Sequence, residues 1–334
     1  MTTGGLHALQ SWLAHEVDER DLELVCAEHP DPSPGEPDRT VVRLSACVRD
    51  VAAHELVELL LVGARRVAIR LDGCSDPAAG AARVDPVVRM LRAGGVDRLT
   101  VETDDPADAR RTVLEADGLP VPRRLLLGLA GGVARTLPVP DDDPHTRLVS
   151  AVRALVPTAT RELTELDAPS LRLTGHGCTA CGVCVLACPP GALRIQHGSG
   201  GGGVAISTLL QTPAACTGCR SCIDLCPTGV LGAVGPWPWS ELLVDREVGV
   251  ATLTTARCER CGTSFPTTSG NRCCPTCTYR RSNPFGSALP PGFTMPSTDI
   301  RDVRMLERGH LGELSAEPGS LDVDGRQRPV EPAG

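Results

Sequence analysis

Short aliphatic runs and longer amphipathic stretches alternate through the first 120 positions of the chain. Aliphatic runs bounded by turn residues predict buried strands at 22–27, 41–46, 66–72 and 98–103. Apolar residues at helical spacing predict helices at 51–62, 84–93 and 107–116, after an amphipathic opening segment. Strands and helices that alternate with short connections favour a parallel, doubly wound sheet with right-handed crossovers. The pattern therefore predicts an α/β domain over residues 1–120.

The remaining chain divides by composition. Residues 121–173 indicate a helical connector, with helices expected at 123–134 and 145–156. Two cysteine-rich modules follow, at 174–232 and 251–282, with different cysteine spacings. After these modules, residues 283–334 are rich in Pro, Gly, Ser and charge, which predicts a largely disordered tail.

Charge and residue usage exclude several functions. All 33 basic side chains are arginine. Because the chain has no lysine, it has neither a Walker-A lysine nor a residue that could form a Schiff base with pyridoxal phosphate. A formal charge of -8 argues against nucleic acid as the partner of the whole chain. No stretch approaches the roughly 20 apolar residues that span a bilayer, and the first residues lack a signal-peptide pattern. We expect a cytoplasmic protein, in which the 16 cysteines serve as metal ligands rather than disulfides.

One cysteine pattern occurs twice in the 174–232 module. Cys-x2-Cys-x2-Cys-x3-Cys-Pro begins at Cys178 and again at Cys216. In this spacing three thiolates hold one [4Fe–4S] cluster, and the fourth, just before proline, reaches the other cluster. The first predicted ligand set is Cys178, Cys181, Cys184 and Cys226. The second is Cys216, Cys219, Cys222 and Cys188.

These motifs, with the following segments CPPGALRI and CPTGVLGA, resemble the bacterial two-cluster ferredoxins throughout residues 174–232. The resemblance implies an α+β ferredoxin fold whose work is the relay of single electrons. The linker HGSGGGGV departs from the family by widening the hairpin between the motifs. Arg220 occupies the place in the second motif that Gly182 has in the first, so we expect the Cys216 cluster to have the higher potential.

A second metal site is indicated near the end of the cysteine-rich region. Cys258-x2-Cys261 and Cys274-x2-Cys277 are separated by twelve residues, and two such knuckles form a tetrahedral site of four thiolates. The module resembles a zinc ribbon, which makes zinc the expected metal and rubredoxin-like iron the alternative. Cys273 is a surplus cysteine that fits the knuckle spacing less well.

Three further cysteines each lie at the end of a predicted strand of the N-terminal domain. Cys26, Cys47 and Cys74 should therefore meet at the carboxyl edge of the parallel sheet, where α/β proteins form ligand crevices. The frame LSACVRD, with DGCSDP after the next strand, resembles the delta subunit of methyl-viologen-reducing hydrogenases. That family implies a [2Fe–2S] cluster held by more cysteines than this chain offers. His29 stands where the family has its second cysteine, and no second cysteine follows Cys74.

Three interpretations of this N-terminal edge stay open. Cys26, His29, Cys47 and Cys74 can together hold a [2Fe–2S] cluster, because histidine replaces cysteine in some such centres. The thiols can also be buried remnants in a domain that only docks to a partner. One of them can be a catalytic cysteine, for which only His29 offers a nearby base.

The leading functional hypothesis is an iron–sulfur electron-transfer subunit rather than an enzyme by itself. The resemblances imply that it relays electrons through two [4Fe–4S] clusters inside a hydrogenase- or heterodisulfide-reductase-like complex, with hydrogenase or dehydrogenase subunits as partners. One alternative is a redox enzyme whose substrate binds in the N-terminal crevice. The other is a redox-sensing regulator whose zinc ribbon binds a macromolecule.

Overall fold

The computed structural model describes residues 6–16, 18–29, 33–34, 38–103, 110–119, 143–199, 205–267 and 270–284. The chain divides into two units, Met1–Cys274 and Pro275–Gly334. The helix predicted at 123–134 lies outside the described residues, as do 200–204 of the glycine-rich linker and 285–334 of the predicted tail. Within the described part, no helix has both the length and the apolar character needed to cross a membrane.

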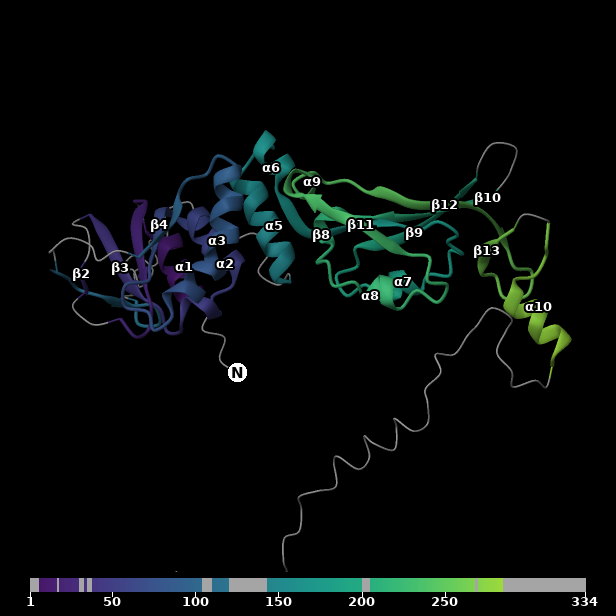
Figure 1. Ribbon diagram of the computed structural model, residues 1–334, viewed down its shortest axis with the longest axis horizontal. Coiled ribbons are helices and arrows are strands. Elements are labelled where there is room, and N and C mark those ends of the chain that lie inside the picture. The colour runs from purple at the N-terminus through teal and green to yellow at the C-terminus, as the bar shows by residue number, and fades with distance from the viewer. Residues whose placement is uncertain are drawn as a thin grey trace, which may run out of the picture. The chain divides into compact units, whose positions relative to one another are not determined.

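A five-stranded parallel sheet forms the centre of the N-terminal region, as predicted (Figure 1). Its order is β5-β4-β1-β3-β7. The strands are β1 (Arg20–Val25), β3 (Arg39–Arg43), β4 (Ala64–Arg70), β5 (Leu99–Glu102) and β7 (Leu114–Glu115). The chain runs from β1 to β3 on one side and then crosses to β4 on the other. The carboxyl ends of these three central strands therefore surround a topological switch point.

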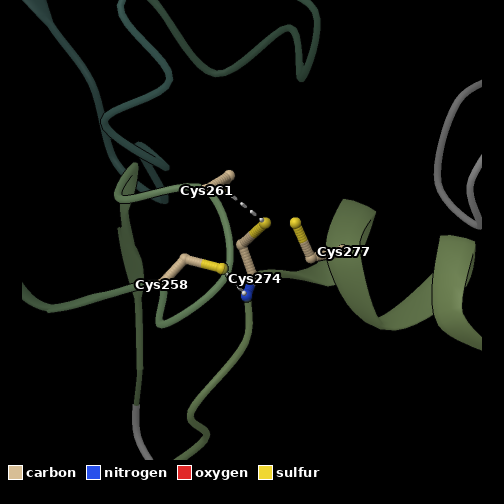
Figure 2. A group of neighbouring side chains, drawn as sticks. All are labelled: Cys258, Cys261, Cys274 and Cys277. Atoms are coloured by element: carbon tan, nitrogen blue, oxygen red, sulfur yellow. Dashed lines mark hydrogen bonds between the residues drawn. The ribbon is translucent and has the colours of Figure 1, made fainter.

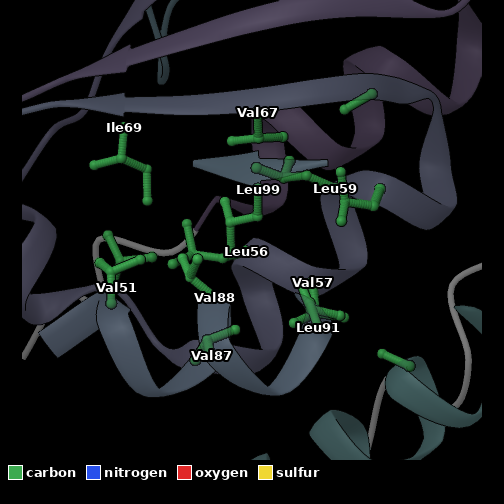
Figure 3. Close-up of a cluster of buried hydrophobic side chains, with 14 of the residues drawn as sticks. Val51, Leu56, Val57, Leu59, Val67, Ile69, Val87, Val88, Leu91 and Leu99 are labelled. Carbon is green, nitrogen blue, oxygen red and sulfur yellow. The ribbon is translucent and has the colours of Figure 1, made fainter. Parts of the chain in front are cut away.

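The two faces of this sheet differ in chemistry. Leu22 and Leu24 of β1 point to the same face as Val67 and Ile69 of β4, and this face packs against the helices. The helices are α1 (His7–His15), α2 (Ala53–Val62) and α3 (Pro77–Ala93). Figure 3 shows α2 and α3 side chains meeting those of β4 and β5. Glu23 and Arg70 lie on the opposite face, where charged side chains pair with one another.

Two predicted helices differ from the structure. The helix predicted at 84–93 begins earlier, at Pro77, because Asp76 caps it by accepting a hydrogen bond from Ala79 N at 3.0 Å. The helix predicted at 107–116 is wrong for residues 110–116. Here the structure has β6 (Arg110–Arg111), paired with β2 (Ser33–Pro34), and β7 at the sheet edge. Val113 is buried with Val25 and Val41, so packing on the sheet outweighs the local helical pattern.

Two helices connect the sheet to the cysteine-rich module. The predicted helix at 145–156 is α5 (Pro144–Leu155), which is followed by α6 (Arg161–Glu165). Arg147 of α5 pairs with the buried Glu58 of α2 at 2.6 Å. The apolar core of the N-terminal domain also includes Trp237 and Trp239 from far along the chain.

The region that holds both cysteine-rich modules contains two antiparallel sheets. In one, β8 (Asp167–Thr174) pairs with β11 (Gly232–Pro238). The other has the order β13-β12-β10-β9. Its strands are β9 (Leu193–Ser199), β10 (Ala205–Gln211), β12 (Val248–Arg257) and β13 (Ser264–Pro266). The helices of the region are α7 (Val183–Leu186), α8 (Ser221–Asp224), α9 (Trp239–Leu242) and, in the second unit, α10 (Pro275–Ser282).

Candidate metal centres

The two cysteine loops of the 174–232 region have the same backbone conformation. In the first loop Ala180 and Gly182 have φ values of 51° and 79°. The corresponding residues of the second loop, Gly218 and Arg220, have φ values of 73° and 65°. Right-handed and left-handed residues in alternation form a concave nest of backbone N–H groups, which suits anionic groups such as iron–sulfur clusters.

The segment after each fourth cysteine is also repeated. Gly191 N donates to Cys188 O at 3.1 Å, and Gly229 N donates to Cys226 O at 3.0 Å. Both glycines have positive φ, which closes a tight turn just after the Cys-Pro pair. The third cysteine of each loop lies in a short helix, Cys184 in α7 and Cys222 in α8. The structure thus builds the same cysteine loop twice.

Each loop lines one cavity, and each cavity receives its fourth cysteine from the other loop. The cysteines of one cavity are Cys178, Cys181, Cys184 and Cys226. Those of the other are Cys188, Cys216, Cys219 and Cys222. The remaining lining is mainly aliphatic, with Ile195 and Leu209 in the first cavity and Leu171 and Leu193 in the second.

The chemistry of the cysteines fits an iron–sulfur cluster in each cavity. Burial, with a contribution from neighbouring cysteines, raises the pKa of Cys184 to about 11 and that of Cys222 to about 11. Thiolates at these positions therefore need a compensating cation, which iron supplies. Backbone amides also reach the sulfurs, because Ala180 N donates to Cys178 Sγ at 3.4 Å and Ala192 N to Cys188 Sγ at 3.2 Å.

Comparison with known proteins agrees with this geometry. The family model described as the 4Fe-4S dicluster domain matches residues 177–230. This part of the chain is a ferredoxin-type domain. It binds iron–sulfur clusters and has the chemistry of electron transfer. No curated protein matches the chain.

A second group of cysteines lies around β13 and the start of α10. The sulfurs of Cys258, Cys261, Cys274 and Cys277 all lie within 4.8 Å of one another (Figure 2). Cys274 N donates to Cys258 Sγ at 3.3 Å, and hydrogen bonds from the backbone lower the pKa of Cys258 to about 6. Four close sulfurs are the donor set of a tetrahedral thiolate site. Cys273 is not part of this group.

The structure also brings together the three cysteines of the N-terminal domain. Their sulfurs lie within 4.8 Å of one another at the carboxyl ends of β1, β3 and β4. Cys26 directly follows β1, Cys47 precedes the 3₁₀ turn Val48–Asp50, and Cys74 N donates to Leu71 O at 3.1 Å. Cys26 is buried, whereas Cys47 and Cys74 are partly exposed.

Arg49 lies beside this group, a contact that sequence reasoning missed. Its Nε donates to Cys47 Sγ at 3.4 Å. Burial acts to raise the pKa of Cys47, but hydrogen bonds from the Arg49 backbone and side chain outweigh it and hold the pKa below its usual value. Burial raises the pKa of Cys26. The two thiols therefore differ in their tendency to ionise.

His29, the fourth ligand proposed from the sequence, is not in the cysteine group. The imidazole is buried, and its Nε2 lies 3.0 Å from Asp72 Oδ2. Asp72 also pairs with Arg70 at 2.6 Å, and Arg70 pairs with the buried Glu23 at 3.2 Å. Only the Asp-Gly-Cys sequence after β4 could have drawn attention to Asp72, since its partner lies 43 positions away.

Proposed function

We propose that the chain relays single electrons through two [4Fe–4S] clusters as a subunit of a redox complex of the hydrogenase or heterodisulfide-reductase kind. The observation that carries the proposal is the pair of cavities, each lined by three cysteines of one loop and the fourth of the other. In this assignment Cys178, Cys181, Cys184 and Cys226 hold one cluster. Cys216, Cys219, Cys222 and Cys188 hold the second.

A bound [4Fe–4S] cluster supplies a one-electron couple without rearrangement of bonds to the protein. The chain's own residues set the conditions for that couple. Aliphatic side chains such as Leu209 and Leu193 line the cavities, and backbone amides such as Ala192 N donate to ligand sulfurs. Arg220 lines the second cavity and adds a cation that the first cavity lacks in the corresponding position, which favours a higher potential there.

Exposed apolar side chains beside the clusters support docking of a protein partner. Leu186, at the end of α7, is 90% exposed, and Leu225, just after α8, is 59% exposed. Both lie between the third and fourth cysteines of their motifs, so a partner that covers them comes close to a cluster. Contiguous apolar patches mark interaction sites, and the helices beside these two leucines, α7 and α8, contact each other. The N-terminal domain resembles the hydrogenase delta subunit, which supports a complex of this class.

The group of Cys258, Cys261, Cys274 and Cys277 completes the proposal as a structural zinc site. Zinc accepts four thiolates in a closed tetrahedral set and takes no part in electron transfer. A site of this kind stabilises the segment around β13 and α10. Rubredoxin-like iron in the same four thiolates would instead make it a third electron carrier.

Metal analysis of anaerobically purified protein, with Cys226→Ser as the variant, tests the crossed ligand sets. The wild type should carry about eight irons and eight acid-labile sulfides, and about one zinc in the Cys258 group. Cys226→Ser should damage the cluster held by Cys178, Cys181 and Cys184, leaving the signal of the other cluster. Cys188→Ser is the matched variant and should have the reverse effect. Absence of labile sulfide, or loss of the Cys216 cluster in Cys226→Ser, would contradict the assignment.

A further inference from the structure

We propose that Cys26, Cys47 and Cys74 form a mononuclear zinc site with three thiolate ligands and a fourth position that takes a ligand from outside. The site lies at the switch point of the parallel sheet, where β1, β3 and β4 end. This inference does not depend on the ferredoxin-type domain or on the proposed redox complex.

The distance between the sulfurs decides how many metal ions they can share. A tetrahedral zinc ion with Zn–S bonds of about 2.3 Å places any two of its sulfur ligands about 3.8 Å apart. All three sulfurs of this group lie within 4.8 Å of one another, so one ion can bind them with small adjustments. A [2Fe–2S] cluster has two irons with two protein ligands each, and the third sulfur would have to move away to reach the second iron.

The spacing of sulfurs in the Cys26 group can be compared with that of the other cysteines in this chain. Among the described residues, only two groups of possible ligands are this tight, namely the Cys258 group and the Cys26 group. The eight cysteines of the ferredoxin-type domain line two cavities and form no such group. Cys26, Cys47 and Cys74 therefore share the geometry of a single-ion site rather than that of a cluster.

Backbone hydrogen bonds fix the turns that carry two of these cysteines. Cys26 O accepts from His29 N at 3.0 Å, and Cys47 O accepts from Asp50 N at 2.9 Å. Arg49 Nε donates to Cys47 Sγ, which offsets the negative charge that three thiolates leave on a divalent ion. Fixed ligands supported by such neighbouring contacts favour metal binding.

The fourth position distinguishes this site from a closed structural one. No fourth cysteine, histidine or carboxylate in the described residues joins the three sulfurs. The Nε2 atom of His29 is engaged by Asp72. A Cβ on Gly73 would lie 2.5 Å from His29 Cδ2, so the loop between Asp72 and Cys74 packs closely on the imidazole. Three protein ligands with an open position are the arrangement that zinc proteins use to bind water or a small molecule.

Zinc analysis of the full-length protein tests the site. The wild type should hold about two zinc ions, and Cys26→Ser/Cys47→Ser/Cys74→Ser should hold one, with iron and sulfide unchanged. His29→Ala and the matched Cys273→Ser control should both retain two. Loss of about two irons and two sulfides from the triple variant would show a [2Fe–2S] cluster instead, and unchanged metal content would overturn the proposal. Loss of zinc from His29→Ala would make His29 a ligand and exclude the open position.

A spectroscopic measurement covers the case in which the triple variant fails to fold. Cys258→Ser/Cys261→Ser protein, which lacks the other set of four thiolates, is titrated with Co²⁺ alone. We expect tetrahedral Co²⁺ bands with sulfur-to-metal charge transfer, and a shift of these bands when a small thiol is added. Absence of such bands would contradict the metal site, and bands that do not respond to thiol would contradict the open position.

Discussion

Individual residues of the two cysteine loops show how strictly the cluster cavities constrain the backbone. Gly182 and Arg220 occupy corresponding positions and both have positive φ, so a side chain is tolerated in this conformation when there is space for it. A Cβ on Gly182 would have Ile195 Cδ1 as its nearest neighbour, at 3.9 Å. A Cβ on Gly218 would instead lie 2.1 Å from Pro169 O. Gly218 is thus required both for its conformation and for the close approach of β8.

This contrast predicts different effects of two alanine substitutions. Gly182→Ala should lower the free energy of unfolding by about 1–2 kcal/mol, the usual penalty for a non-glycine residue in the left-handed conformation. It should leave the iron content unchanged. Gly218→Ala should cost more and lower iron content, because either β8 or the cysteine loop must move. Thermal unfolding and iron analysis of both variants measure the difference. Equal effects would show that the contact with Pro169 does not constrain the loop.

The cysteines of the N-terminal domain were predictable from the sequence, whereas their neighbours in space were not. Cys26, Cys47 and Cys74 were expected to meet because the carboxyl ends of parallel strands share one edge, and the structure brings their sulfurs together. His29 is the predicted fourth ligand because it stands where the resembled family has its second cysteine, and histidine replaces cysteine in some [2Fe–2S] centres. Its actual partner, Asp72, comes from the end of another strand, and pairing between side chains so far apart in sequence leaves no local pattern.

The strands and helices were predictable where the apolar pattern and the packing agree. The four strands expected before residue 104 correspond to β1, β3, β4 and β5, which are buried between neighbours in the sheet or against helices. The segment 110–116 was mispredicted because its few apolar residues are compatible with a helix, whereas burial of Val113 against β1 and β3 depends on the finished sheet. Long-range strand pairing cannot be derived from such a short segment.

Two ion pairs between β1 and β4 differ in burial, and we expect them to differ in their contribution to stability. Arg70 and Glu23 both have side chains with 0% exposure and lie 3.2 Å apart. Arg65 pairs with Asp21 at 2.6 Å on the same two strands, but its side chain is 57% exposed. Arg70→Met should lower the free energy of unfolding by about 3 kcal/mol, because Glu23 loses a fully buried cationic partner and retains the pair with the partly exposed Arg39. Arg65→Met, the matched control, should cost at most about 1 kcal/mol.

Urea unfolding of the full-length protein measures these changes through tryptophan fluorescence. The chain has three tryptophans, and Trp12, Trp237 and Trp239 all belong to the core of the N-terminal domain. Their emission therefore follows the unfolding of this core, in which all three side chains are buried. Similar losses in Arg70→Met and Arg65→Met would contradict the argument from burial.

Within the unit Met1–Cys274, the ferredoxin-type domain is joined to the α/β core by more than the connecting chain. Gln211 lines the second cluster cavity, and its Oε1 accepts a hydrogen bond from Trp237 Nε1 at 3.4 Å. Trp237 lies on β11, which pairs with β8, and it packs into the core that contains α1 and α2. A continuous set of contacts therefore leads from the cavity to the N-terminal helices.

These contacts predict that cluster binding stabilises the α/β core. A group that binds only the folded state stabilises whatever unfolds together with its site, and each kcal/mol shifts the midpoint by about 2–4 °C in a domain of this size. Removal of iron by anaerobic chelation should therefore lower the midpoint of the tryptophan-monitored thermal transition. Cys258→Ser/Cys261→Ser is the control, since β13 and α10 contribute nothing to this core among the described residues, and its midpoint should equal that of the wild type. An unchanged midpoint after iron removal would show that the two domains unfold independently despite the Gln211–Trp237 contact.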